Sequence, residues 1–168
     1  MTKNIILIGL MGSGKTTVGK KLADKLNMEF IDTDELIVQK ALKSINQIFA
    51  EDGEIFFRNL ESDVIKEISD QKNLVISTGG GSVIREENIN NLKKNGILFY
   101  LYAPANELLK RIKNDTERPL IKTENPLETL KNLLEKREKY YNTADFKINT
   151  CEKSFEEIAD EIISLFAY

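Results

Sequence analysis

Residues 9–16, GLMGSGKT, have the residue types and the spacing of a phosphate-binding loop. Glycine at positions 9, 12 and 14 lets the backbone curl, so that successive N–H groups and a helix N-terminus can point at phosphate oxygens. Lys15 would reach the β- and γ-phosphates, and the Thr16 hydroxyl would ligate Mg²⁺. The alternative is a glycine-rich turn with a chance lysine, but the apolar run before the loop and the helical pattern after it favour phosphate binding. The expected nucleotide-binding set in this stretch is Gly12, Ser13, Gly14, Lys15, Thr16 and Thr17.

Two carboxylates, Asp32 and Asp34, follow the short apolar run at residues 30–31. Residues two apart at a strand end share one face, and we expect them at the sheet edge on which the phosphate loop lies. Asp32 could orient water on Mg²⁺, while Asp34 could accept a hydrogen bond from a substrate hydroxyl and act as a base. The alternative is a solvated turn with an N-cap aspartate, since Glu35 begins a helical run. The pair alone does not decide between these interpretations.

Arg58 lies on a helix expected over residues 54–69, four residues after Glu54 and three before Glu61. One interpretation is an ordinary ion pair on the helix surface. The other is that Glu61 holds Arg58 for bidentate recognition of a substrate carboxylate, which lysine does poorly. Arg137, on a later helical segment, presents the same two alternatives.

Three consecutive glycines, Gly79, Gly80 and Gly81, come directly after the strand expected at residues 74–77. Such a run indicates either a floppy turn or a backbone that another group approaches closely, and its place at a strand end favours the ligand crevice. Because no acidic residue ends this strand, the usual Walker-B aspartate is missing there. We assign its role to Asp32, and the absence argues against an ATPase motor.

Residues 113–125, KNDTERPLIKTEN, form a mostly polar segment between two helical patterns. A segment of this kind is either a dispensable surface loop or a lid. Arg118 within it favours a lid, because a phosphoryl-transfer site must exclude water and gather positive charge.

The elements that would position these residues alternate along the chain. Apolar runs alternate with longer amphipathic segments, which is typical of an α/β fold with a parallel sheet covered by helices. The runs lie at residues 5–8, 30–31, 74–76, 97–101 and 146–148. Residues 44–47 and 154–157 are typical of helix-starting capping boxes, and Pro126 is expected to open a helix. The last helix should pack its apolar face, Phe155, Ile158, Ile162 and Phe166, into the core.

Length and composition limit the possible functions. A chain of 168 residues fits one domain spanning residues 1–168. The net charge of −3 argues against a nucleic-acid partner. With no histidine and one cysteine, the chemistry must rely on carboxylates, lysine, arginine and metal. No apolar run approaches the roughly 20 residues of a membrane span, so we expect no membrane partner, a cytoplasmic location and, by default, a monomer.

Taken together, the motifs resemble those of shikimate kinase, in order over almost the whole chain. They are the stretches at residues 9–20, 31–34 (IDTD), 52–58 (DGE-x-x-FR), 79–83 (GGGSV), 118–120 (RPL) and 137–140 (R-x-x-Y). The resemblance implies a three-layer P-loop kinase fold of the nucleoside-monophosphate-kinase type. It further implies a five-stranded parallel sheet in the order 2-3-1-4-5 with helices on both faces, a substrate-binding region at about residues 33–61, and a mobile lid at about residues 113–125.

The resemblance also implies the reaction, transfer of the γ-phosphoryl group of ATP to the 3-hydroxyl of shikimate with Mg²⁺. The implied catalytic residues are Lys15, Asp34 and Arg118, and the implied metal ligands are Thr16 and, through water, Asp32. The substrate set would be Asp34, Arg58, Gly79, Gly80, Gly81 and Arg137, with the two arginines on the carboxylate. Arg111 could stack on the adenine; alternatively, it is an exposed helix arginine beside Lys110. The sequence departs from the family pattern at residues 118–121, which read RPLI rather than RPLL, and at residues 149–154, which lack an expected proline.

Three other functions are weighed. Gluconate kinase or another P-loop small-molecule kinase would share the phosphate loop, but the acceptor residues suit a compact hydroxylated carboxylate. A GTP-dependent switch requires a guanine-reading NKxD motif, which the sequence does not contain. A nucleotide-binding protein without catalysis would give no reason for arginines and carboxylates at the acceptor positions.

Overall fold

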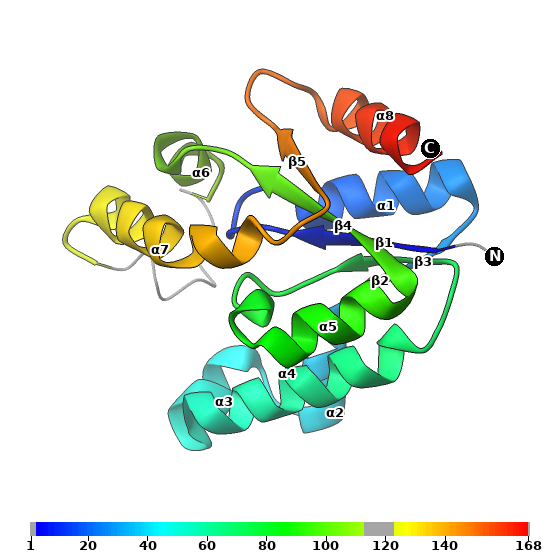
Figure 1. Cartoon of the computed structure of the whole chain (residues 1–168). Helices are drawn as coiled ribbons and strands as arrows, with labels where there is room; N and C mark the ends of the chain where they lie inside the picture. The colour runs from blue at the N-terminus through cyan, green and yellow to red at the C-terminus, as the bar shows by residue number, and fades with distance from the viewer. Residues whose placement is uncertain (1–2, 113–122, 168) are drawn as a thin grey trace.

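The computed structural model describes residues 3–112 and 123–167, and it is built on one five-stranded sheet. The strands are β1 (Asn4–Ile8), β2 (Glu29–Asp32), β3 (Leu74–Ser77), β4 (Gly96–Tyr102) and β5 (Phe146–Asn149). They pair in the order β2-β3-β1-β4-β5, and all four pairings are parallel (Figure 1). The sheet order expected from the family resemblance is therefore confirmed, and each apolar run in the sequence lies within a strand.

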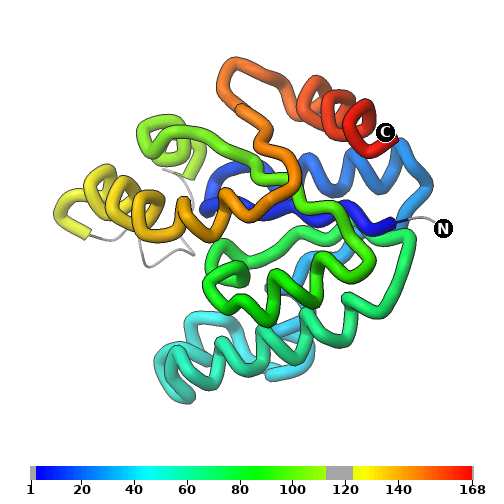
Figure 2. Tube along the Cα trace, viewed as in Figure 1, coloured from blue at the N-terminus to red at the C-terminus, as the bar shows by residue number. Residues whose placement is uncertain are grey.

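Helices cover both faces of this sheet and complete the three layers. The helices are α1 (Lys15–Leu26), α2 (Thr33–Ala41), α3 (Ile45–Glu51), α4 (Gly53–Ser69), α5 (Glu86–Asn95), α6 (Ala105–Ile112), α7 (Pro126–Tyr141) and α8 (Phe155–Phe166), with a short 3₁₀ turn at Ser82–Ile84. Helices α1 and α8 lie side by side on one face, while α2 to α5 lie on the other (Figures 1 and 2). No helix among the described residues is long and apolar enough to cross a bilayer.

The central strand β1 supplies both halves of the core, because its side chains alternate between the two faces. Ile5 and Leu7 join the apolar cluster under α1 and α8, whereas Ile6 and Ile8 join the cluster that contains residues of α4 to α7. Burial on both faces explains why the strand is an unbroken apolar run. A third, smaller cluster of Ile37, Ile48, Phe57 and Val64 holds α2, α3 and α4 together.

Local signals set where several helices begin. Both expected capping boxes are present, at Ser44 before α3 and at Ser154 before α8, and Pro126 opens α7. Helix α1 begins directly after the phosphate loop, and α2 directly after β2. Because the strands are parallel, these loops and helix N-termini come together at the carboxyl edge of the sheet, where open α/β sheets bind ligands.

Candidate active site

A cavity of about 1010 Å³ opens at this edge of the sheet. Most of the residues expected to bind nucleotide, metal or acceptor line it together: Gly12, Gly14, Lys15, Thr16, Thr17, Asp32, Asp34, Gly79, Gly80 and Arg111. The remaining lining comes from the phosphate loop, α2, the start of α3 and the residue before it, the end of β3 and the residue after it, the last residue of α6 and the first residue of α8. One connected space therefore joins the phosphate loop to the glycine turn.

The phosphate loop adopts the conformation that its glycines allow. Gly12 has φ +78° and Gly14 φ +95°, in the left-handed region that favours glycine, and Gly14 is the residue before the first turn of α1. The Lys15 ammonium lies across the loop and donates to the carbonyls of Gly9 at 2.8 Å and Leu10 at 3.1 Å. Ser13, which belongs to the loop, is buried and does not line the cavity. The loop thus presents the N-terminus of α1 to the cavity, which suits an anion.

Asp32 links the phosphate loop to the second strand. Its Oδ2 accepts a hydrogen bond from the Thr16 hydroxyl at 3.1 Å, and its Oδ1 accepts from the Asp34 backbone N–H at 3.0 Å. The second bond makes Asp32 the N-cap of α2, so the capping role considered from the sequence is present and coexists with the contact to Thr16. A hydroxyl and a carboxylate side by side next to a phosphate loop are the oxygen donors that Mg²⁺ prefers, so these residues fit the metal.

The glycine turn after β3 is closely approached by charged side chains. A Cβ atom on Gly79 would lie 2.8 Å from Asp34 Oδ1, and one on Gly81 would lie 2.7 Å from Arg58 Cζ. A Cβ on Gly80 would lie 3.4 Å from Arg137 Nη1. None of the three glycines has a positive φ, so the turn needs glycine for space rather than for backbone conformation. The sequence left two alternatives for these three glycines, a floppy turn or a backbone that other groups approach closely. The structure shows the close approach.

Arg58 is held in place by the buried carboxylate of Glu61. Its Nη1 donates to Glu61 Oε2 at 2.8 Å, and Glu61 is 1% exposed. The other Glu61 oxygen accepts from the Ser82 hydroxyl at 2.8 Å, which connects α4 to the residue after the glycine turn. Glu54, which is exposed, lies farther from the guanidinium, at 3.6 Å from Nε. A buried, hydrogen-bonded carboxylate fixes the guanidinium in place in a way that a surface ion pair does not.

Tyr141, rather than Tyr140, is the tyrosine that reaches the site from α7. Its phenol donates a 2.6 Å hydrogen bond to the Gly80 carbonyl, and the side chain is fully buried. Burial raises the pKa of Tyr141 to about 12, while the nearby positive charges of Arg137 and Arg58 act in the opposite direction. Tyr141 lies one residue beyond the R-x-x-Y motif and four residues after Arg137, so the two side chains project from the same face of α7.

At the opposite end of the cavity lie Arg111 and Phe155. The Arg111 guanidinium donates to the Thr150 hydroxyl at 3.0 Å and to the Thr150 carbonyl at 3.1 Å, so it is fixed against the loop before α8. Phe155 was expected in the core, but it is 39% exposed and lines the cavity beside Gly14. The reason is its place as the first residue of α8, where the ring lies over the phosphate loop while Ile158 and Ile162 pack inward.

Not every expected residue lines the cavity. Arg58, Gly81 and Arg137 adjoin it at the glycine turn. Arg118, and all of the expected lid except residues 123–125, lie outside the described residues. Sequence reasoning missed the contributions of Thr33, whose hydroxyl accepts from the Gly79 N–H at 3.0 Å, and of Ser82, Tyr141 and Phe155. The helical spacing from Arg137 could have revealed Tyr141.

Comparison with known proteins gives a consistent result. A family model described as shikimate kinase matches residues 11–167. The chain is 48% identical over 161 residues to a shikimate kinase of Thermodesulfovibrio yellowstonii. The aligned region covers 96% of this chain and 93% of the relative. A solved structure described as shikimate kinase from Acinetobacter baumannii in complex with shikimate superposes with a TM-score of 0.95 at 40% identity, covering 99% of this chain and 94% of that one. A gluconokinase from Sinorhizobium meliloti, at 19% identity and a TM-score of 0.71, shares the fold alone.

Proposed function

This chain belongs to the shikimate kinase family, and we propose that the residues gathered around its cavity carry out that family's reaction, transfer of the γ-phosphoryl group of ATP to the 3-hydroxyl of shikimate. The observation that carries the assignment is the glycine turn, which two carboxylates, Asp34 and Glu61, and two guanidinium groups, Arg58 and Arg137, approach from three helices. A small hydroxylated carboxylate complements this arrangement, because arginines bind a carboxylate and an aspartate binds a hydroxyl.

On the acceptor side, Arg58 and Arg137 bind the carboxylate of shikimate. Glu61 prepares Arg58 for this by fixing one edge of its guanidinium, which leaves the other edge for the substrate. Asp34 accepts a hydrogen bond from the 3-hydroxyl and orients its oxygen toward the phosphoryl group. The backbone of Gly79, Gly80 and Gly81 forms the surface on which the ring rests, and residues 33–61 are the substrate-binding region.

On the donor side, the backbone of Gly12, Ser13 and Gly14 and the side chain of Thr17 surround the phosphates of ATP. Lys15 leaves the loop carbonyls to contact the β- and γ-phosphates, and Arg118 adds a second positive charge from a lid at residues 113–125. Thr16 and Asp32 would hold Mg²⁺, which supplies charge neutralisation on the phosphates when bound. The adenine packs between the fixed guanidinium of Arg111 and the ring of Phe155.

The reaction then depends mainly on position and charge. Phosphoryl transfer passes through a loose transition state in which little covalent work is left to the protein. Asp34 aligns the attacking hydroxyl and takes its proton as the new P–O bond forms, while the bond between the γ-phosphorus and the bridging oxygen breaks and ADP leaves. Lys15 and Arg118 stabilise the negative charge that spreads over the transferred oxygens.

The proposal extends to the domain organisation, oligomeric state, location and partners of the protein. The chain acts as a single domain and a monomer in the cytoplasm, with no nucleic-acid or membrane partner. The net charge of −3 supports the part of this proposal that concerns nucleic acid, because nucleic-acid-binding domains typically carry a net basic surface.

A coupled assay of ADP release with shikimate, gluconate and nucleoside monophosphates tests the assignment. We expect release to depend on both Mg²⁺ and shikimate, and Arg58→Ala to raise the KM for shikimate with little change in kcat, because Arg58 binds a group remote from the reaction. ADP release no faster with shikimate than without it would overturn the acceptor assignment. A faster rate with gluconate would favour the gluconate kinase alternative instead.

A further inference from the structure

Tyr141 is the last residue of α7, and its phenol joins that helix to a segment 61 residues away. It donates to the Gly80 carbonyl at 2.6 Å, and the residue is fully buried. The Gly80 carbonyl is partly buried, and its hydrogen-bond donor is a side chain rather than a neighbouring strand. The hydrogen bond therefore fixes the C-terminal end of α7 to the glycine turn.

The same residue of the turn is approached by Arg137, one helical turn earlier. Residues four apart lie on one face of a helix, so the guanidinium and the phenol project together from α7. A Cβ on Gly80 would come within 3.4 Å of Arg137 Nη1, and the Arg137 guanidinium lies near enough to the Tyr141 phenol to act on its pKa in the lowering direction. Arg137 thus stands over the turn in a position that depends on where the end of α7 is anchored.

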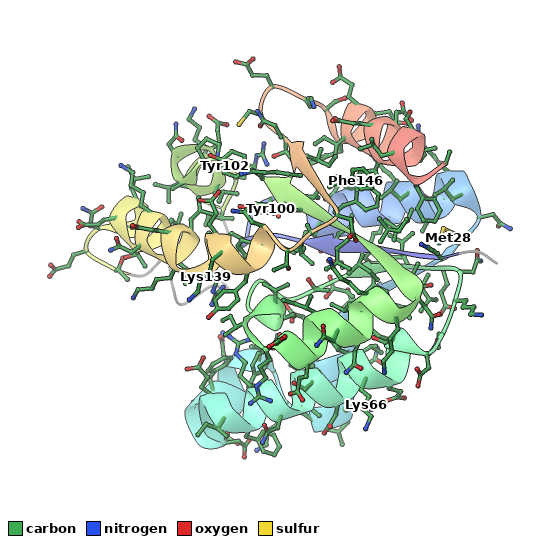
Figure 3. All side chains as sticks on the ribbon, viewed as in Figure 1. Met28, Lys66, Tyr100, Tyr102, Lys139 and Phe146 are labelled. Atoms are coloured by element: carbon green, nitrogen blue, oxygen red, sulfur yellow. The ribbon has the colours of Figure 1, made fainter. Side chains whose placement is uncertain are left out.

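The ring of Tyr141 is held independently of its hydroxyl. It stacks on Tyr100 of β4 with ring centroids 4.9 Å apart and planes 25° from parallel. Figure 3 labels Tyr100 on β4, close to the C-terminal end of α7. Because the stack belongs to the apolar core, phenylalanine at position 141 would keep the ring in place and remove only the hydroxyl.

We propose that Tyr141 is a positioning residue for the acceptor, which holds Arg137 over the glycine turn so that its guanidinium meets the carboxylate of shikimate. This inference rests on the proposed function, in which Arg137 binds that carboxylate. Tyr141 itself touches neither substrate nor nucleotide in this scheme. Its effect is on the binding of shikimate rather than on the transfer step.

The test compares Tyr141→Phe with Tyr140→Phe, which removes the hydroxyl of the adjacent, half-buried tyrosine whose ring lies beneath Lys139. For Tyr141→Phe we expect the KM for shikimate to rise about five- to tenfold, as for the loss of one hydrogen bond to a buried group, with kcat and the KM for ATP within about twofold of the parent. Tyr140→Phe should match the parent in all three. An unchanged KM for shikimate in Tyr141→Phe, or equal rises in both KM values with a fall in kcat, would overturn the proposal.

A double-mutant cycle with Arg137→Ala separates positioning from independent binding. If Tyr141 acts through Arg137, the double variant should bind shikimate no more weakly than Arg137→Ala alone, by isothermal titration. Additive losses would show that Tyr141 acts by another route and would overturn the proposal. Failure of the parent enzyme to release ADP with shikimate would instead overturn the proposed function, so the two results are distinguishable.

Discussion

At the scale of single residues, Asp32 shows how one side chain serves both the fold and the site. Its two oxygens are used separately: one caps α2 through the Asp34 N–H, and the other accepts from the Thr16 hydroxyl. The strand β2 places it there, with Asp32 paired in register to Ser77 of β3. The sequence left the cap and the metal site as alternatives, and the geometry accommodates both.

Asp32→Asn should separate these two roles. Asparagine caps helices about as well as aspartate, so the free energy of unfolding should change by no more than about 0.5 kcal/mol. The loss of a carboxylate beside Thr16 should raise the Mg²⁺ concentration needed for half-maximal activity by roughly 10- to 100-fold. Urea unfolding and a Mg²⁺ titration of ADP release measure the two effects.

The matched control is Asp24→Asn, which changes an exposed carboxylate on α1. It should leave both the stability and the Mg²⁺ dependence as in the parent enzyme. An Asp32→Asn variant with an unaltered Mg²⁺ titration would show that this carboxylate has no part in holding the metal.

At the scale of elements, the glycine turn is where β3 meets side chains from three helices. Asp34 comes from α2, Arg58 and Glu61 come from α4, and Arg137 comes from α7. Local sequence signals determine where each helix begins or ends. The three helices meet at this turn only because the sheet order puts β3 between β2 and β1. The sheet topology thus brings the residues proposed to bind the acceptor together at this turn.

Gly81→Ala should disturb this element without unfolding the protein. The added Cβ would collide with the end of the Arg58 side chain, and moving that guanidinium would weaken its hydrogen bond to the buried Glu61, so the free energy of unfolding should fall by about 1–3 kcal/mol. The displaced guanidinium should raise the KM for shikimate by roughly tenfold, the equivalent of about 1.4 kcal/mol of binding. Gly80→Ala, whose Cβ would meet Arg137 at 3.4 Å, should have a smaller effect. Equal KM values for the two variants would contradict this ranking.

Elements were more predictable from the sequence than contacts between them. The apolar runs predicted the strand positions. Helix α4 begins at Gly53, one residue before the expected start, and ends at Ser69 as expected. Tyr141, Ser82 and Phe155 were not predicted, because their roles depend on partners that local periodicity does not reveal, such as Gly80 for Tyr141. The pairing of Arg58 with Glu61 could be anticipated because the two residues lie one turn apart on the same helix, whereas the substrate-binding role of Arg58 came from the family resemblance and stays a prediction.

At the scale of the whole molecule, two buried phenols make the fold sensitive to alkali. Burial raises the pKa of Tyr100, and it raises that of Tyr141 to about 12. A raised pKa means that the unfolded chain loses the proton first. The stability associated with the neutral phenols is therefore complete below pH 10 and is lost as the pH rises toward the folded-state value.

Urea unfolding between pH 8 and pH 11 should accordingly show a falling free energy of unfolding above about pH 10. For Tyr141 alone the free energy of unfolding should fall by about 1.4 kcal/mol by pH 11, one pKa unit above the value for an exposed phenol, and by roughly 3 kcal/mol only above the folded-state pKa of about 12. Tyr141→Phe should be less stable than the parent at pH 8 but should lose less stability on going to pH 11. Parallel curves for the two proteins would show that this phenol does not contribute to the alkaline transition.

The glycine turn also has a consequence for drug resistance. An inhibitor that rested on the backbone of residues 79–81 would make its main contacts with a surface that carries no side chains. A substitution at Gly79 or Gly81 that repelled the compound would also displace Asp34 or Arg58, which are proposed to bind the acceptor. Escape by mutation at this turn would thus tend to reduce the enzyme's own activity, which makes the turn a durable target.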